Sequence, residues 1–230
     1  MAFTNSHHTV KRFDTELDSL VGQVLEMGRT AAQQVARAVE AFNSGDIQTA
    51  REVIATDDII NRRDIDIDQG CIRLLTRRQP VSTDLRLIMS LNKAVQDLER
   101  IGDEAKNIAS KALDIQGRGS ALRGGIACDI NHLARLVLQR FQTAREVLAQ
   151  LNTERAWRLL SGHEDDVDAA FEDSLRSLSI RALDGGPAAI ANLIDVVLVL
   201  KALKRVSDHA ENLAEYVIYV VEGRDVRHVR

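Results

Sequence analysis

Proline, cysteine and aromatic residues are scarce in this chain of 230 residues, which has two prolines, two cysteines and 3% aromatic residues. Cys71 and Cys128 have no Cys-x-x-Cys spacing, so a disulfide framework is excluded, and we expect two reduced thiols buried as small apolar groups. The N-terminal residues lack the apolar segment of a signal peptide, and the apolar run 196–200 is far too short to cross a bilayer. We therefore expect a soluble, cytoplasmic protein.

An excess of one charge is also lacking. The chain has 30 Lys and Arg against 34 Asp and Glu, a formal net charge of -4, and the two signs are interspersed. No basic stripe with stacking aromatic residues is present, which argues against a nucleic-acid partner. Good helix formers such as Ala, Leu, Arg and Glu are abundant, and together with the scarcity of proline they predict an all-α fold.

An internal repeat is the most informative feature of the sequence. The segments 98–109 and 203–214 are identical at six of twelve positions, about 105 residues apart. Such self-similarity predicts a duplicated architecture, with a first half at 1–116 and a second at 117–230. Each half is long enough to bury a core, and the glycine-rich segment 116–125 separates them.

Apolar periodicity predicts three long helices in each half, and hence two tandem three-helix bundles. The only two prolines, Pro80 and Pro187, occupy the same place in the two copies, directly before the last helix of each half. We expect a break of the second helix near Thr56 and an unbroken fifth helix. The expected helices cover 13–43, 46–76, about 82–114, 126–151, 154–183 and 188–221.

Acidic and amide side chains recur at helical spacing on the middle and last helix of each half, which places them on one face of each helix. Carboxylate and amide oxygens on adjacent helices suit a divalent or ferric cation such as Fe, Zn, Mn or Mg, and a bound cation relieves the repulsion between carboxylates. The candidate metal ligands are Asp57, Asn61, Asp64, Glu99 and Asp103 in the first half, and Glu164, Asp168 and Asp208 in the second.

Two alternatives to a metal-binding stripe remain open at this stage. Acidic residues at helical spacing are also typical of a solvated face, in which Asp103 would pair with Arg100 or Lys106. In the second half Asp208 would then pair with Arg205 or Lys204. The other alternative is a metal-storage bundle with metal-dependent activity. A di-iron bundle requires Glu-x-x-His pairs, and the sequence contains none.

Sequence signals for catalysis are missing as well. The chain has no Gly-x-x-x-x-Gly-Lys phosphate loop and no nucleophile elbow. His209 has no nucleophile at a suggestive spacing. We therefore do not expect an enzyme.

Several segments resemble the PhoU family of bacterial phosphate-signalling and phosphate-transport accessory proteins, and the resemblance covers nearly the whole chain. The segments that carry it are Phe13-Asp-Thr-Glu-Leu17, Met27-Gly28, Arg78-Gln-Pro-Val-Ser-Thr-Asp-Leu-Arg86, Leu98-Glu-Arg-Ile-Gly-Asp103 and Glu222-Gly-Arg-Asp-Val-Arg-His-Val229.

The resemblance implies two three-helix bundles without enzymatic activity, which often self-associate, for example as a homodimer. It implies negative regulation of the phosphate regulon and restraint of phosphate uptake. The implied partners are the ATPase subunit of the phosphate ABC transporter and a membrane-bound sensor histidine kinase, and only through them would the chain associate with a membrane. The chain would act as an adaptor that favours the phosphatase-competent state of the kinase.

The family's metal signature is an acidic residue followed by three spacers and Asp, once in each half. The first copy is intact at Glu99 and Asp103, whereas Lys204 replaces the acidic residue of the second copy and Ser207 replaces a glycine. A protonated lysine does not bind a metal ion, so we expect it to pair with Asp208 in place of the cation. The first half should then hold any metal more strongly than the second.

Charged residues also gather around the first proline turn. Arg78, Asp84, Arg86 and Arg100 would either dock a partner or brace the second and third helices. We expect bracing.

Overall fold

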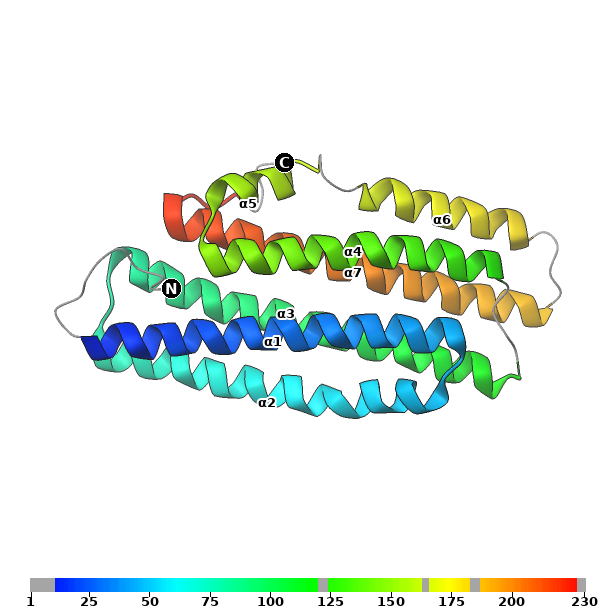
Figure 1. Ribbon diagram of the computed structural model, residues 1–230, viewed down its shortest axis with the longest axis horizontal. Helices are drawn as coiled ribbons and strands as arrows, with labels where there is room; N and C mark the ends of the chain where they lie inside the picture. Colours follow the sequence, from blue (N-terminus) through cyan, green and yellow to red (C-terminus); the bar gives the residue numbers. More distant parts are fainter. Residues whose placement is uncertain (1–10, 120–123, 163–165, 183–186, 227–230) are drawn as a thin grey trace.

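The chain is all-helical in the computed structural model, as predicted, over the residues that the structure describes: 11–119, 124–162, 166–182 and 187–226. No strand occurs in these residues, and none of their helices is both long and apolar enough to span a membrane. Seven helices are present in them (Figure 1). They are α1 (Lys11–Ser44), α2 (Ile47–Arg78), α3 (Ser82–Gly117), α4 (Gly124–Gln150), α5 (Thr153–Leu160), α6 (Val167–Ala182) and α7 (Pro187–Glu222).

Local sequence explains where the first helices end. Gly45 has φ of +72°, a left-handed conformation that glycine adopts without strain, and it terminates α1. Asp46 then begins α2, because its side chain accepts hydrogen bonds from the backbone N–H groups of Gln48 and Thr49 at 2.9 and 3.1 Å. α2 runs without a break through Thr56, so the interruption expected there is wrong.

The unbroken helix expected at 154–183 is also wrong, because two helices occupy this part of the chain. α5 ends at Leu160, where Ser161 is followed by Gly162 with φ of +69°. The Asp166 side chain accepts from the backbone N–H of Ala169 at 2.9 Å and starts α6. In the part of the chain that the structure describes, the second half therefore has four helices where the first has three, although the repeat itself is retained.

α3 and α7 form the centre of the molecule and run antiparallel along nearly its full length (Figure 1). α1 and α2 cover α3, whereas α4, α5 and α6 cover α7. α1 also packs against α4, so the two halves lie side by side. Their buried apolar residues form one continuous core, and the boundary predicted after residue 116 falls at the end of α3.

The contacts along this central pair show how the repeats are related. Arg86 near the start of α3 contacts Val220 near the end of α7, and Glu104 contacts Arg205 further along. Because equivalent residues of the two repeats are about 105 positions apart, these contacts place Gly102 of α3 opposite its own equivalent, Ser207 of α7. An approximate twofold axis crosses the seam between α3 and α7 there.

Candidate metal stripes and the seam between the halves

The first-half stripe begins at a buried carboxylate on α2. Asp57 is only 5% exposed and its Oδ2 accepts a hydrogen bond from Lys106 Nζ of α3 at 2.7 Å. The same oxygen lies 3.4 Å from Asn61 Nδ2. Among the described residues, no group donates to Asp57 Oδ1 or Asn61 Oδ1, although both oxygens are buried. Buried oxygens without a donor are costly, and a cation or a donor would relieve that cost.

Further along the same stripe, partly buried carboxylates influence one another, and Arg100 is only loosely paired with two of them. Burial and the charge of Asp68 raise the pKa of Asp64. Burial raises the pKa of Glu99, and Asp103 raises it further, although Arg100 acts in the opposite direction. The Arg100 guanidinium is mostly exposed and lies 3.6 Å from Glu99 and 3.7 Å from Asp103. This part of the stripe favours protons or cations.

In the second half, a lysine pairs with the carboxylates of the stripe. Lys204 Nζ of α7 lies 2.5 Å from Asp208 Oδ1, one turn along the same helix, and 3.0 Å from Asp168 Oδ1 on α6. The expected pairing with Asp208 is therefore present, and the contact with Asp168 adds a link between helices. Glu164 lies outside the described residues.

The alternative ion pairs expected from the sequence are also settled in part. Asp103 lies near Arg100, whereas Lys106 pairs with Asp57 instead. Arg205 does not pair with Asp208 but donates to Glu104 across the seam at 3.0 Å. Within the described ranges, no three His, Cys, Asp or Glu side chains converge as a group that could hold a metal ion. Metal binding at the eight candidate residues stays a prediction.

Gly102 and Ser207, the equivalent residues near the twofold axis, pack in different ways. A Cβ at Gly102 would stand 2.8 Å from Ile60 Cδ1, so glycine allows α3 to approach α2 closely. Ser207 is fully buried and its hydroxyl accepts a hydrogen bond from Arg140 Nη1 of α4 at 3.2 Å. Serine at position 207, in place of the glycine of the family pattern, thus binds the buried guanidinium of Arg140.

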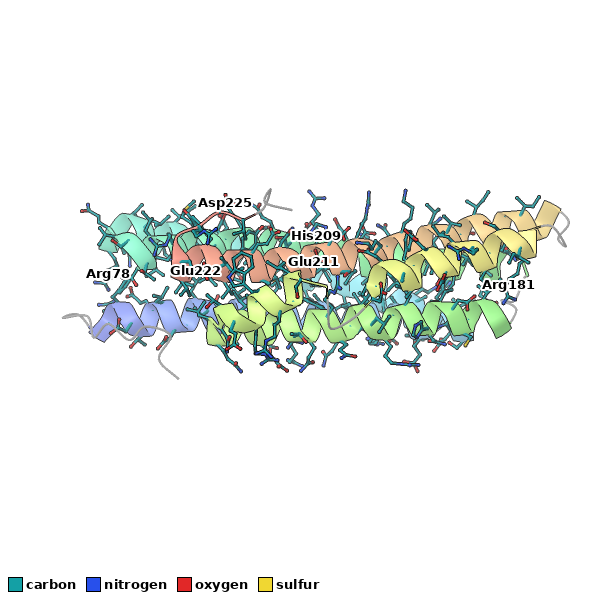
Figure 2. The ribbon with its side chains drawn as sticks, turned by 90° about the horizontal axis from the view of Figure 1, so that it is seen from above. Arg78, Arg181, His209, Glu211, Glu222 and Asp225 are labelled. Carbon is teal, nitrogen blue, oxygen red and sulfur yellow. The ribbon has the colours of Figure 1, made fainter. Side chains whose placement is uncertain are left out.

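The charged group at the proline turn braces other helices than those expected. Arg78 makes a two-pronged contact with Glu16 of α1, at 3.0 to 3.2 Å. Arg86 donates to the backbone carbonyl of Val220 at 3.1 Å and so ties α3 to α7. Bracing is therefore correct for these two arginines, but it acts toward α1 and the second half. Figure 2 shows Arg78 near one end of the long axis.

The seam between α3 and α7 contains a buried polar cluster that the sequence did not reveal. Asp97 of α3 is 7% exposed, and its Oδ1 lies 2.7 Å from His209 Nδ1 and 3.0 Å from Asn212 Nδ2. Its Oδ2 accepts from the hydroxyl of Tyr216 at 2.7 Å. His209 lies in the central part of the molecule, away from both ends (Figure 2). Three side chains of the second half thus satisfy one carboxylate of the first.

No sequence signal of ordinary strength could have found this cluster. Asp97 stands where the second repeat has Ala202, so the repeat itself gives no hint of a role. The cluster exists only because α3 and α7 run antiparallel in one register, which local patterns do not specify. An acidic residue within an otherwise apolar helix face was the single available sign.

The two cysteines differ in a way that we did not expect. Cys71 is buried, and burial raises its pKa to about 11. Cys128 is exposed, so its expected burial is wrong.

These features define a class of protein, a duplicated helical bundle whose halves pair through their last helices and carry acidic helix faces. The family model described as the PhoU domain matches twice, at residues 24–112 and 130–217, and the chain belongs to the PhoU family.

Curated relatives agree along the whole chain. A phosphate-specific transport system accessory protein PhoU homolog of Pseudomonas aeruginosa is 37% identical over 224 residues, which cover 97% of this chain and 91% of that protein. The PhoU protein of Escherichia coli K12 is 30% identical over 222 residues, covering 96% and 90%.

Solved structures share the fold. The crystal structure of PhoU from Pseudomonas aeruginosa matches with a TM-score of 0.84 and 36% identity, covering 92% of this chain and all of that one (100%). The crystal structure of the phosphate transport system regulatory protein PhoU from Streptococcus pneumoniae matches with a TM-score of 0.83 and covers 93% of this chain and 99% of that one. At 24% identity, this match supports the fold alone.

Proposed function

We propose that this protein is an accessory and regulatory protein of phosphate transport, and that it represses the phosphate regulon when phosphate is plentiful. The observation that carries the proposal is 37% identity, across both repeats, to a phosphate-specific transport system accessory protein. It acts without catalysing a reaction, as an adaptor in the cytoplasm. Its partners are the ATPase subunit of the phosphate ABC transporter and a sensor histidine kinase, and it self-associates as a homodimer.

Exposed apolar side chains support the adaptor role. Leu85 and Met89 are exposed near the start of α3, and Ile190 and Ile194 occupy the equivalent places near the start of α7. Because α3 and α7 are antiparallel, these two pairs lie toward opposite ends of the molecule. Exposed large apolar residues at equivalent places mark surfaces that a partner could cover. Two such surfaces suit a protein that connects two others.

Metal binding is a second component of the proposal and is confined to the first half. Asp57, Asn61, Asp64, Glu99 and Asp103 would hold the ion, and the buried oxygens of Asp57 and Asn61 that lack donors support this set. A divalent ion would supply positive charge that neutralises the crowded carboxylates. Metal analysis of Glu99→Ala and Asp208→Ala variants tests the asymmetry. Equal loss of metal from both would contradict it.

The alternative function is metal storage, with metal-dependent activity, by the same stripes. It predicts that the purified protein carries stoichiometric redox-active metal and that the phosphate response does not depend on the protein. The observation in its favour is the group of partly buried carboxylates at Asp64, Glu99 and Asp103, where burial and mutual repulsion raise the pKa of Asp64 and of Glu99.

The decisive experiment is an alkaline phosphatase reporter of the phosphate regulon in a deletion strain grown with excess phosphate. We expect constitutive expression that a plasmid copy reverses. An Asp103→Ala copy should fail to restore repression while its circular dichroism stays normal. Asp66→Ala, which removes an exposed carboxylate from the α1 side of α2, is the matched control and should restore it. Normal repression in the deletion strain would refute the regulatory role.

A further inference from the structure

Lys204 has an unusual position for a lysine on a helix surface. Its side chain is only 25% exposed, and its ammonium contacts one carboxylate of its own helix and one of the neighbouring helix α6. A lysine ammonium is positively charged at neutral pH, and here that charge lies between two carboxylates.

The two repeats place their lysines differently along the same stripe. In the first half, position 99 is Glu and position 106 is Lys, and Lys106 links α3 to Asp57 of α2. At the equivalent positions of the second half the charges are exchanged, to Lys204 and Glu211. Glu211 instead forms an ion pair with Arg140 of α4, in which Glu211 Oε1 lies 2.5 Å from Arg140 Nη1. Each half thus has one lysine between its middle and last helices, but the two lysines stand about two turns apart.

This exchange leaves different parts of the stripe with positive charge. In the first half, the section containing Asp64, Glu99 and Asp103 has Arg100 as its nearest cation, at 3.6 Å or more from Glu99 and Asp103. In the second half, Lys204 stands at the position equivalent to Glu99 and directly contacts Asp208 and, on α6, Asp168, the residue equivalent to Asn61. A divalent ion between Asp168 and Asp208 would have to displace a covalently attached cation.

We propose that Lys204 is a built-in cation that takes the place of a metal ion in the second half and fastens α6 to α7. The second half therefore does not fit the metal that the family resemblance implies. Divalent metal acts on the first half alone, and the attachment of α6 is independent of metal. This inference concerns the structure of the second half and does not depend on the role in phosphate regulation.

Hydrogen exchange followed by mass spectrometry on the full chain tests the proposal, with EDTA or with added Mn²⁺ or Zn²⁺. In the wild type, exchange of α6 amides should not respond to metal. Lys204→Met should speed exchange in α6 about 2- to 5-fold, as expected for loss of a partly exposed ion pair, and metal should not restore protection. Lys201→Met is the matched control, since Lys201 is exposed one turn away on α7, and it should leave α6 unchanged.

Three further variants separate charge from packing. Lys204→Arg keeps the charge and should keep the protection of α6. Asp168→Asn removes the negative charge from the contact between helices but leaves Asp208 in place, and it should also speed exchange in α6. Lys204→Glu restores the acidic residue of the family signature, so protection of α6 should become dependent on Mn²⁺.

The proposal has clear ways to fail. It would be overturned if metal changed α6 exchange in the wild type, or if Lys204→Met and Asp168→Asn behaved like Lys201→Met. Failure of Mn²⁺ to protect α6 in Lys204→Glu would show that a metal ion cannot stand in for the lysine.

Discussion

Replacing Asp97 by alanine should lower the stability of the whole chain, because Asp97 is the shared acceptor for three side chains across the seam. Hydrogen bonds to a charged group contribute about 1.5–3 kcal/mol each. His209 and Asn212 are partly exposed, so water can replace their acceptor. The hydroxyl of Tyr216 is buried and would lose its 2.7 Å hydrogen bond to the Asp97 carboxylate at a place where water is less able to replace it. We therefore expect a loss of about 3 kcal/mol, which for a chain of this size lowers Tm by about 6–12 °C.

Urea unfolding followed by circular dichroism measures this loss, and the fluorescence of Trp157, the single tryptophan, reports on the second half. The two signals should coincide in the wild type, because the halves share one core. Gln96→Ala, at the exposed neighbouring position, is the control and should change stability by less than about 0.5 kcal/mol.

A double-mutant cycle with Tyr216→Phe isolates the bond between the halves. The coupling energy should be about 1.5 kcal/mol or more. A loss below about 0.5 kcal/mol for Asp97→Ala, or strict additivity in the cycle, would refute the reasoning that the seam depends on this carboxylate.

Four other predictions follow from the surroundings of single residues. Gly102→Ala should lower the free energy of unfolding by about 1–3 kcal/mol, because the added Cβ overpacks against Ile60. Gly22→Ala has no atom near the added Cβ and should stabilise α1 by about 0.5–1 kcal/mol. Thermal unfolding of the two variants measures both effects. Glu99→Gln should stabilise the protein at pH 7 by about 0.5 kcal/mol. The raised pKa of Glu99 means that the folded state binds its proton more tightly, so this gain should shrink as pH falls toward the ordinary value of 4.5; a gain that persists at pH 3 would contradict it. Iodoacetamide at pH 8 should label Cys128 and spare Cys71, whose pKa is about 11, as mass spectrometry of the native protein can show.

Much of the fold could be predicted because it depends on local patterns. The repeat, the two prolines and the apolar periodicity predicted helices whose ends lie close to those observed. The error at 154–183 has a local cause that was visible, namely Gly162 followed by the capping residue Asp166. At the place equivalent to Gly162 the first half has Ala55, and α2 continues through it. The expectation of one unbroken helix gave the similarity between the repeats more weight than the helix-stop signal in the second copy.

The site was predictable only where it depends on spacing within one helix. The pairing of Lys204 with Asp208 followed from a separation of four residues. Partners on different helices were not accessible, because they require the register between helices. Lys106, one of two alternative partners expected for Asp103 on its own helix, binds Asp57 on α2, and Arg205 donates across the seam to Glu104.

The approximate twofold axis at Gly102 and Ser207 has a consequence for how this protein could diversify. If two identical subunits paired in this way, any change near the axis would appear twice, and both copies would have to tolerate it. Joining the subunits in one chain removes that constraint. Position 102 can then remain glycine to admit Ile60 while position 207 becomes serine to hold Arg140. In this duplicated chain, one half therefore combines a glycine contact with a loosely paired acidic face, while the other has an arginine anchor and a lysine at the equivalent places.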